Sequence, residues 1–582
     1  MPDSSGYYAS SAAFETFATY DFQSGKPTQS EDANNQITNY EYEMGNSLGR
    51  LKRVILPDGG EVKKTYNDVT GSLYILSETK QSASVWLKDE THFDALGRAW
   101  KTRHFEGGTQ WSERQTEFDS LGRAWRTSNP YFPGATLEWT ETKFDALGRV
   151  TEVKTPDGAK VTTVYSGVKV TVTDPANKTR RSETDALGRL KQVVEDPSGL
   201  NYATNYTYST LGDLIKVEQG TQYRYFLYDS ASRLLRARNP EQSANANLNL
   251  TPPSDQATGN TQWALKYVYD SNGNLTSKVD PRNTTTSYGY DAINRNIWAS
   301  YNDGVTPALE RHYDGAISNG KGRFYYNFNY TANPATGGAG YSRLVIGGYD
   351  AVGRVTSQSQ GFLANDGVTW KDFQSTRTYD LAGHALTQGY PQSGRSVSYS
   401  YGASGRLASA GGNLGGSSYT YADTISYNAA GQMARERFGT TANLYHNLHY
   451  NNRLQLVDIR LGDSSSDEWN WSRGALVFYY GTTARDGWNA FANSADNNGN
   501  VLRQINYVQL VNENVKVIHS EKLKLTRPDR AKSAMLKSAC SSTRSASHSI
   551  SAIGDHHTAI TSRVVTASRP VNRALLARPH SR

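Results

Sequence analysis

The chain has 582 residues and a formal net charge of +7, from 62 Lys and Arg against 55 Asp and Glu. Its 38 Tyr, 51 Gly and 11 Trp are typical of strands and turns, so a mostly helical protein is excluded. Cys540 is the only cysteine, which excludes a disulfide within the chain.

The first 39 residues have the pattern of a partial leading repeat. Tyr20-Asp21-Phe22 and Asp32-Ala33-Asn34 resemble the interior of a repeat, and without a preceding cap we expect an internal piece of something longer. Met1 to Ser10 lack the basic and apolar regions of a signal peptide, so the localisation stays unknown. No apolar run approaches the roughly 20 residues that a membrane helix needs, so we expect no membrane insertion.

Residues 40–510 repeat one short motif: an aromatic residue, Asp, two variable residues, Gly and Arg. The copies lie mostly about 20 to 26 residues apart, and such a period indicates a repeat architecture in which each unit is one supersecondary element. The close copies, three of which replace either the Asp or the Gly, are Phe93 to Arg98, Phe118 to Arg123, Phe144 to Arg149, Tyr228 to Arg233, Tyr290 to Arg295, Tyr349 to Arg354 and Tyr401 to Arg406. Looser copies begin at Tyr42, Thr184, Tyr208, Tyr269, Tyr313, Tyr379, Tyr427 and Tyr450.

The motif predicts a tight turn between two strands. The Asp side chain can bond to the backbone two residues on, and Gly supplies the positive φ that closes the turn. The flanks alternate, as in residues 149–154, and Pro-Asp-Gly at 57–59 and 156–158 predicts a second turn at the other end of the hairpin. The predicted structural turn residues include Asp94, Gly97, Arg98, Asp119, Gly122, Arg123, Asp145, Gly148, Arg149, Asp350, Gly353 and Arg354.

This pattern resembles the Rhs or YD-repeat family, which includes bacterial Rhs proteins, the shell component of Tc toxins and a region of teneurins. The resemblance covers roughly residues 20 to 510. Within this range more than a dozen copies agree in type and spacing. It implies an all-β ribbon of hairpins that spirals into a hollow shell around a toxic polypeptide. It also implies a secreted or cell-surface protein. Asp196 to Leu200 imitate the ending of the family's autoprotease segment but lie in mid-array, so no protease residue is predicted.

Three stretches depart from the repeat. Residues 239–261 and 326–340 are expected to be surface loops between hairpins, because Asn, Pro, Ser and Gly replace the alternation. Residues 511–582 carry 13 Lys and Arg against 4 Asp and Glu, with no Tyr. We expect a disordered or out-of-frame tail, with a mobile basic segment and a folded toxin as alternatives. Nucleic acid would bind only nonspecifically through this tail, since 1–510 is near neutral.

Three other motifs resemble ligand-binding loops but lack residues that such loops need. Gly315 to Lys321 resemble a phosphate-binding loop, but Gly322 stands where Ser or Thr should hold a metal. Asp270 to Asn274 and Asp496 to Asn500 resemble calcium loops in composition, yet turn chemistry accounts for them.

The histidine pairs give no metal site. His446 and His449, like His556 and His557, lack a further ligand at metal spacing and are predicted to be solvated. The repeated Asp residues are assigned to local hydrogen bonding rather than to catalysis. We therefore predict no catalytic, cofactor or metal residue, and no enzyme.

The favoured function is a structural shell segment that encloses or displays a polypeptide such as a toxin. Its partners would be that cargo or a protein that closes the shell. The alternative is a binding module for cell-surface carbohydrate or protein, in which exposed Trp and Tyr contact the ligand.

Overall fold

The computed structural model describes residues 14–43, 49–240, 264–330, 341–364, 369–439, 443–484, 487, 489, 493–508 and 516–522. The chain divides into two units, Met1–Leu523 and Lys524–Arg582. Every described residue belongs to the first unit. Among these residues no helix is long and apolar enough to cross a bilayer.

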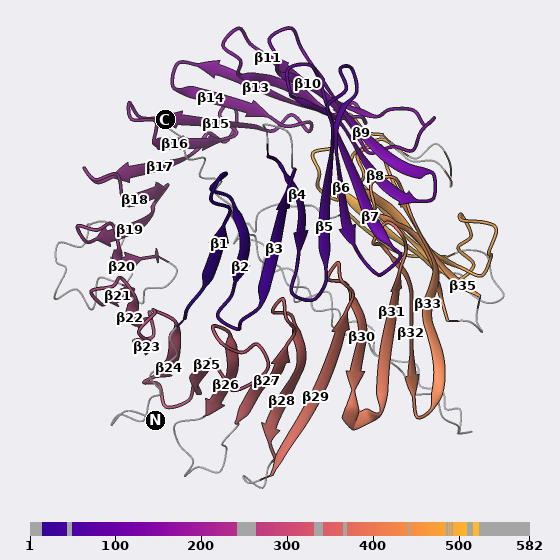
Figure 1. The fold of residues 1–582 in the computed structure, drawn as a ribbon. Helices are drawn as coiled ribbons and strands as arrows, with labels where there is room; N and C mark the ends of the chain where they lie inside the picture. Colours follow the sequence, from indigo (N-terminus) through magenta and orange to yellow (C-terminus); the bar gives the residue numbers. More distant parts are fainter. Residues whose placement is uncertain are drawn as a thin grey trace, which may run out of the picture. The chain divides into compact units, whose positions relative to one another are not determined.

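The described part of the first unit is a sheet of 39 strands, in which each strand pairs antiparallel with the next strand of the chain. Figure 1 shows this ribbon running in chain order. A short 3₁₀ helix, η4 (Pro391–Ser393), lies in one of the hairpin turns. The all-β hairpin array predicted from the motif is therefore confirmed.

The first strands are β1 (Phe17–Tyr20), β2 (Pro27–Glu31), β3 (Ile37–Tyr42), β4 (Leu51–Ile55), β5 (Glu61–Asn67), β6 (Leu73–Lys80), β7 (Trp86–Phe93), β8 (Ala99–Gly107), β9 (Gln110–Phe118), β10 (Ala124–Ser128), β11 (Trp139–Phe144), β12 (Val150–Lys154), β13 (Lys160–Ser166), β14 (Lys169–Thr173), β15 (Thr179–Thr184), β16 (Leu190–Glu195), β17 (Tyr202–Tyr208), β18 (Leu214–Gln219), β19 (Gln222–Tyr228) and β20 (Leu234–Arg238).

The remaining strands are β21 (Leu265–Tyr269), β22 (Leu275–Val279), β23 (Thr285–Tyr290), β24 (Asn296–Tyr301), β25 (Ala308–Tyr313), β26 (Phe324–Tyr330), β27 (Ser342–Tyr349), β28 (Val355–Leu363), β29 (Trp370–Tyr379), β30 (Ala385–Tyr390), β31 (Arg395–Tyr401), β32 (Leu407–Leu414), β33 (Ser417–Tyr427), β34 (Met433–Phe438), β35 (Leu444–Tyr450), β36 (Leu456–Gly462), β37 (Gly474–Tyr479), β38 (Arg503–Val508) and β39 (Lys516–Lys522).

Two kinds of turn alternate along the ribbon. The turns that hold the repeat motif, here called Asp turns, join an odd-numbered strand to the next even-numbered strand, as 145–149 joins β11 to β12. The turns at the other ends of the hairpins, here called distal turns, join an even-numbered strand to the next odd-numbered one, as 155–159 joins β12 to β13. All Asp turns therefore lie along one edge of the ribbon and all distal turns along the other.

A register shift marks the aromatic residue that begins most copies of the motif. Phe144 pairs with Val150 after a shift that follows Lys143, and Tyr208 pairs with Leu214 after the same kind of shift. An extra residue of this kind bends the strand and increases its twist. The motif thus sets the twist of the ribbon as well as its turns.

Few side chains of the ribbon are fully buried. Val193, Val194 and Val477 are among them, but most strand residues keep part of their surface exposed. A single sheet has two faces and no second layer within the repeat to cover them. This explains why a hydrophobic fraction of 37% suffices for the chain.

The structure corrects one predicted loop and leaves another outside its described part. Residues 326–330 belong to β26, which pairs with both β25 and β27. The Asn residues that suggested a loop alternate with aromatic residues, and the Asn327 side chain accepts a hydrogen bond from the Leu344 amide at 3.0 Å. Residues 331–340 lie outside the described residues, as does the predicted 239–261 loop from residue 241 onward.

Strands also form within residues 1–39, the expected partial leading repeat, and after residue 510, the expected end of the repeat. Strands β1 and β2 precede residue 40, and β2 pairs with β3. Strand β39 pairs with β38, although residues 511–582 were expected to form a tail without strands. The stretch Lys516-Val517-Ile518-His519 does not alternate strictly, and the composition around it is basic, so the sequence did not indicate a strand here. Residues 523–582 lie outside the described residues, so the prediction for them stays a prediction.

Candidate functional site

The Asp turn at 145–149 shows what the motif does. The Gly148 amide donates to the Asp145 carbonyl at 3.0 Å, and Gly148 has φ +79°. The Asp145 Oδ1 accepts from the amides of Leu147 and Arg149, both at 2.9 Å, while its Oδ2 accepts from Arg149 Nε at 2.7 Å. The amide of Arg149 and its side chain both lower the pKa of the Asp145 carboxyl. The carboxylate is therefore committed to its own turn.

The same arrangement recurs at the other predicted turn residues. The distance from Asp Oδ2 to Arg Nε is 2.7 Å in the turns of Asp94 and Asp119 and 2.5 Å in that of Asp350. Gly97, Gly122 and Gly353 have φ values of +77°, +80° and +91°. Two turns place Ser232 and Asn294 at the glycine position, with φ values of +59° and +65°.

Each Arg also reaches the next repeat. The Arg149 guanidinium lies 4.2 Å from the ring centroid of Tyr165, and the Tyr165 hydroxyl donates to the Val150 carbonyl at 3.0 Å. The Arg123 guanidinium lies 4.6 Å from the Phe144 ring, and its Nη1 donates to the Asp145 carbonyl at 3.2 Å. The Arg therefore ties its own turn to the following one by charge, ring contact and hydrogen bond.

The tyrosine hydroxyl bond is a regular feature of the ribbon. Burial raises the pKa of Tyr208, Tyr269 and Tyr290, so their hydroxyls stay protonated donors at neutral pH. Sequence reasoning missed this bond and the role of Arg, although the regular Tyr and Arg of the motif carried the signal. The tyrosines that donate to the residue after the preceding motif are Tyr66, Tyr165, Tyr208, Tyr269, Tyr290, Tyr313, Tyr349, Tyr379, Tyr401, Tyr427, Tyr450 and Tyr480.

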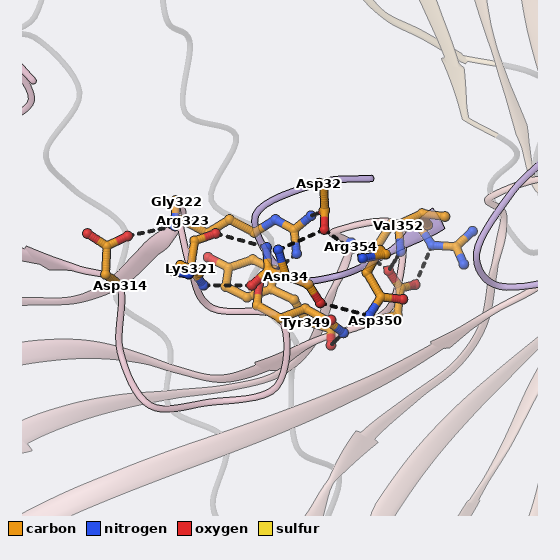
Figure 2. Close-up of polar contacts among 12 residues, drawn as sticks. Asp32, Asn34, Asp314, Lys321, Gly322, Arg323, Tyr349, Asp350, Val352 and Arg354 are labelled. Carbon is orange, nitrogen blue, oxygen red and sulfur yellow. Dashed lines mark hydrogen bonds and ion pairs between the residues drawn. The ribbon is translucent and has the colours of Figure 1, made fainter. Parts of the chain in front are cut away.

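Two distant stretches of the ribbon meet edge to edge, along what is here called the seam. Distal turns of residues 32–174 contact Asp turns of residues 314–498. At the first of these contacts Asn34 Nδ2 donates to the Lys321 carbonyl at 3.0 Å, and the Lys321 amide donates to Asn34 Oδ1 at 2.8 Å (Figure 2). Arg323 Nη2 lies 3.3 Å from Asp32 Oδ2 in the same cluster.

Five further contacts along the seam share one pattern, in which the distal turn supplies an acid and the Asp turn supplies a donor. Their partners lie between 296 and 340 residues apart in the sequence. The pairs are Asp58 with Arg354 at 2.8 Å, Glu106 with Arg406 at 2.6 Å, Glu138 with Asn452 at 3.0 Å, Asp157 with Asn497 at 2.7 Å and Asp174 with Asn498 at 3.3 Å. The direction is reversed at one neighbouring contact, where Asn129 Nδ2 of a distal turn donates to the Asn452 carbonyl at 2.7 Å.

The seam accounts for two motifs that suggested ligand binding. Lys321 of the phosphate-loop pattern bonds to Asn34 through its amide, while the Gly322 amide donates to Asp314 Oδ1 at 2.6 Å. Asn497 and Asn498 of a calcium-like loop donate to acids across the seam. Among the described residues no group of three His, Cys, Asp or Glu is placed to hold a metal ion.

The other calcium-like loop and the protease-like ending are turns. Asn274 Nδ2 donates to Asp270 Oδ2 at 2.9 Å, so the carboxylate is used within its own turn. The Leu200 amide donates to Asp196 Oδ2 at 2.9 Å, where β16 and β17 are joined. A groove of about 680 Å³ lies beside the first seam contact and is lined by Phe17, Leu56 and Val352 among others.

The prediction that His446 and His449 are solvated is wrong. His449 is 10% exposed, bonds to Asp458 at 2.5 Å and stacks on Trp469 with centroids 4.0 Å apart. Burial raises the pKa of Asp458, but the bonds from His449 and Arg460 outweigh it and lower that pKa to about 2. His446 pairs with Glu436 at 2.8 Å. His556 and His557 lie outside the described residues.

Comparisons with known proteins agree with this geometry. Residues 141–309 match the family model described as Teneurin YD-shell. Comparison of the sequence with curated proteins gives no match. The resemblance to the Rhs/YD-repeat family is confirmed by this match and by the solved structures below.

The solved structures similar to this chain include several of Tc toxin proteins. The crystal structure of TcdB2-TccC3-TEV has a TM-score of 0.67 at 13% identity, over 88% of this chain and 31% of that one. The crystal structure of TcdB2-TccC3 gives 0.57 at 16% identity, over 87% and 28%. The Photorhabdus luminescens Tc holotoxin pore gives 0.56 at 14%, over 85% and 30%. The likeness is therefore one of fold, and this chain spans less than a third of those chains.

Proposed function

We propose that this protein is a wall segment that encloses or displays a polypeptide and performs no chemistry itself. The match of residues 141–309 to the Teneurin YD-shell family model supports this proposal. The observation that carries the proposal is the seam. A ribbon whose distal edge bonds to its own Asp-turn edge about 300 residues later is built to form a continuous wall.

The use of the polar side chains supports a structural role. The repeated carboxylates accept bonds from their own turns, and the arginines bridge neighbouring repeats. A catalytic site needs a few groups that converge on a reacting atom with pKa values suited to proton transfer. Here the pKa values of Asp94, Asp119 and Asp145 are all lowered, chiefly by the same backbone bond from the following Arg. Because the same hydrogen bonds surround each of these carboxylates, they favour a structural role for the Asp residues over a catalytic one.

The comparisons support an enclosed or attached polypeptide as the partner. One similar structure is the crystal structure of TcdB2-TccC3-Cdc42, and another is that of TcdB2-TccC3 without its hypervariable C-terminal region. The first joins TcdB2-TccC3 with Cdc42, and the second lacks the hypervariable C-terminal region. By analogy of fold, we assign to this chain a polypeptide cargo or a polypeptide that closes the wall.

The test is protection of a cargo from protease. A protease-sensitive reporter polypeptide would be fused after residue 582 of the full chain, and its digestion followed over time. We expect the fused reporter to be cut more slowly than the same reporter alone, because a wall excludes the protease. Equal rates would contradict the proposal.

A matched pair of variants separates enclosure from simple attachment. Arg406→Gln removes a seam bond whose partners are 17% and 11% exposed, whereas Arg282→Gln removes an ion pair whose Arg is 78% exposed. We expect faster digestion in the first variant and no change in the second. Equal effects would mean that the seam plays no part in protection.

The alternative of a glycan-binding module makes a different prediction. Exposed aromatic residues such as Phe373 and Tyr419, at 58% and 48%, would stack on sugar rings. Binding to a glycan array that is abolished by Phe373→Ala or Tyr419→Ala would favour this alternative over the wall.

A further inference from the structure

Two sets of Asp turns differ in what covers them. The later set, in residues 314–498, lies against distal turns at the seam. Its apolar tips are partly covered: Val352 lies beside Leu56 and Pro57, and the Leu381 amide donates to the Gln81 carbonyl at 3.2 Å. The earlier set, in residues 94–233, presents exposed leucines instead. Leu96, Leu121, Leu147, Leu187 and Leu211 are 78%, 71%, 78%, 76% and 68% exposed.

These five leucines form a row along one edge of the sheet. They all precede the glycine of an Asp turn, and turns of successive hairpins lie about 10 Å apart because each hairpin adds two strands. The turn between β13 and β14, which holds Val168 at 50% exposure, lies between the turns of Leu147 and Leu187. Large apolar side chains that are exposed singly need no explanation, but a contiguous series of them marks an interaction surface. The row of leucines is here called the leucine edge.

The Asp turns of the leucine edge carry the same pair of Asp and Arg side chains as the covered turn of Asp350. Arg98, Arg123 and Arg149 bond to their own Asp and keep 32%, 29% and 41% of their side chains exposed. At the seam, Arg354 also bonds to its own Asp350 and still binds Asp58 of a distal turn, while only 23% exposed. An arginine in an Asp turn can therefore hold its own carboxylate and a second one.

The covered turns show what kind of partner fits this edge. At the turns of Arg354, Arg406 and Asn452 a distal turn of the same ribbon places an acid opposite the donor of the Asp turn. The chain holds further distal turns of this kind in residues 196–306. Asp280 and Asp303 bond within their own turns, while Leu200 and Val305 at such turns are 84% and 78% exposed. The turns of Asp196 and Asp303 thus present a carboxylate beside an apolar side chain, Leu200 or Val305, as the leucine edge requires.

We propose that the leucine edge binds the distal turns of residues 196–306 of a second copy of this chain. The contact repeats between molecules the edge-to-edge packing that the seam makes within one molecule. The two surfaces differ, so the contact is head-to-tail, and copies add to an open series or a ring rather than stop at a symmetric dimer. This proposal goes beyond the proposed wall function and does not depend on a cargo.

Sedimentation velocity of the full chain over roughly 1 to 100 µM tests the proposal, since weak head-to-tail contacts associate in that range. We expect the weight-average mass to rise with concentration beyond that of a dimer. The triple variant Leu96→Ser, Leu121→Ser, Leu147→Ser should need at least about tenfold more protein for the same average mass. Val164→Ser, which changes a 63% exposed residue on a strand, should associate as the wild type does.

A charge variant addresses the opposite surface. Asp303→Lys should weaken association as the triple variant does, because it places a cation against the arginines of the leucine edge. The leucine and Val164 variants should keep the wild-type far-UV spectrum and thermal transition, since those side chains are exposed. Asp303 is half-buried and accepts a bond from Thr306, so the Asp303→Lys protein is compared only if it keeps the wild-type far-UV spectrum. A wild type that stays monomeric at every concentration would overturn the proposal. So would a triple variant that associates like the wild type, or association that Asp303→Lys leaves unchanged.

Discussion

Arg354 holds two carboxylates at once, one in its own turn and one in a turn 296 residues earlier. Its Nε lies 2.5 Å from Asp350 Oδ2, and its Nη2 lies 2.8 Å from Asp58 Oδ2. Its Nη1 donates to the Asp380 carbonyl of the next repeat at 3.0 Å. The residue that closes a local turn therefore also joins neighbouring repeats and crosses the seam.

The first prediction compares two arginines that differ in the seam bond. Arg354→Gln should lower the free energy of unfolding by about 1 to 3 kcal/mol more than Arg149→Gln, because it leaves the largely buried Asp58 without its cation. Urea unfolding followed by Trp fluorescence measures both. Equal losses for the two variants would mean that the bond to Asp58 adds nothing to stability.

The second prediction concerns the left-handed glycine at 148. No atom would lie within 4 Å of an added Cβ, so a substitution there tests backbone strain alone. Gly148→Val should cost about 1 to 2 kcal/mol, because a β-branched residue fits a φ of +79° poorly. Gly148→Asn should cost much less, since Asn294 already occupies the equivalent position at φ +65°. Thermal melts that rank Val and Asn equally would refute the assignment.

The third prediction separates the two contacts of a motif tyrosine. Tyr165→Phe removes the hydroxyl bond to the Val150 carbonyl and should cost about 1 kcal/mol. Tyr165→Leu also removes the ring under Arg149 and should cost more. Phe144, which holds the Arg123 guanidinium without a hydroxyl, shows that the ring alone is tolerated. If Phe and Leu at position 165 give the same stability, the ring contact contributes nothing.

The fourth prediction is the direction of the pH dependence. Asp94, Asp145 and Asp458 have folded-state pKa values below their ordinary ones. Their stabilisation is present above the unfolded pKa of about 3.9 and is lost as the pH falls through the folded values. The free energy of unfolding should therefore fall between about pH 4 and pH 2.

Asp458 gives that prediction its sharpest test, because its pKa is lowered to about 2. Asp458→Asn should reduce the loss of stability between neutral pH and about pH 3. Urea titrations at the two pH values measure it. A wild type as stable at the lower pH as at the higher would contradict the assignment.

The fifth prediction concerns the basic end of the chain. Residues 524–582 carry 11 Lys and Arg against 2 Asp and Glu. A chain that ends after residue 523 keeps β39, so it should melt as the full chain does and bind heparin more weakly, with a smaller dependence on salt. Loss of the cooperative transition would show that the ribbon needs those residues.

The local part of this structure follows from the sequence. Asp and Gly three positions apart in the motif dictate a turn through bonds within five residues, so composition and spacing suffice to predict it. The contact of Arg149 with Tyr165 joins neighbouring repeats, and the regular Arg and Tyr of the motif could have predicted it. These interactions depend on near neighbours alone.

The seam could not be predicted in the same way. Its acids, such as Asp58 and Glu106, lie in distal turns of different sequence, and their partners follow about 300 residues later. Which turns meet depends on the twist accumulated over many hairpins. The burial of His449 was missed for a related reason, because Trp469 comes from the long turn after β36 rather than from a neighbouring repeat.

The most direct test of the seam is a double-mutant cycle between Arg406 and Glu106. Gly402 stands where other Asp turns have their Asp, so Arg406 has no acid in its own turn and the cycle isolates the seam bond. With Arg406→Gln, Glu106→Gln and the double variant, urea unfolding should give a coupling energy of about 1 to 3 kcal/mol, since the two side chains are 17% and 11% exposed. A coupling energy of zero would mean that these two turns, 300 residues apart, do not meet in the folded protein.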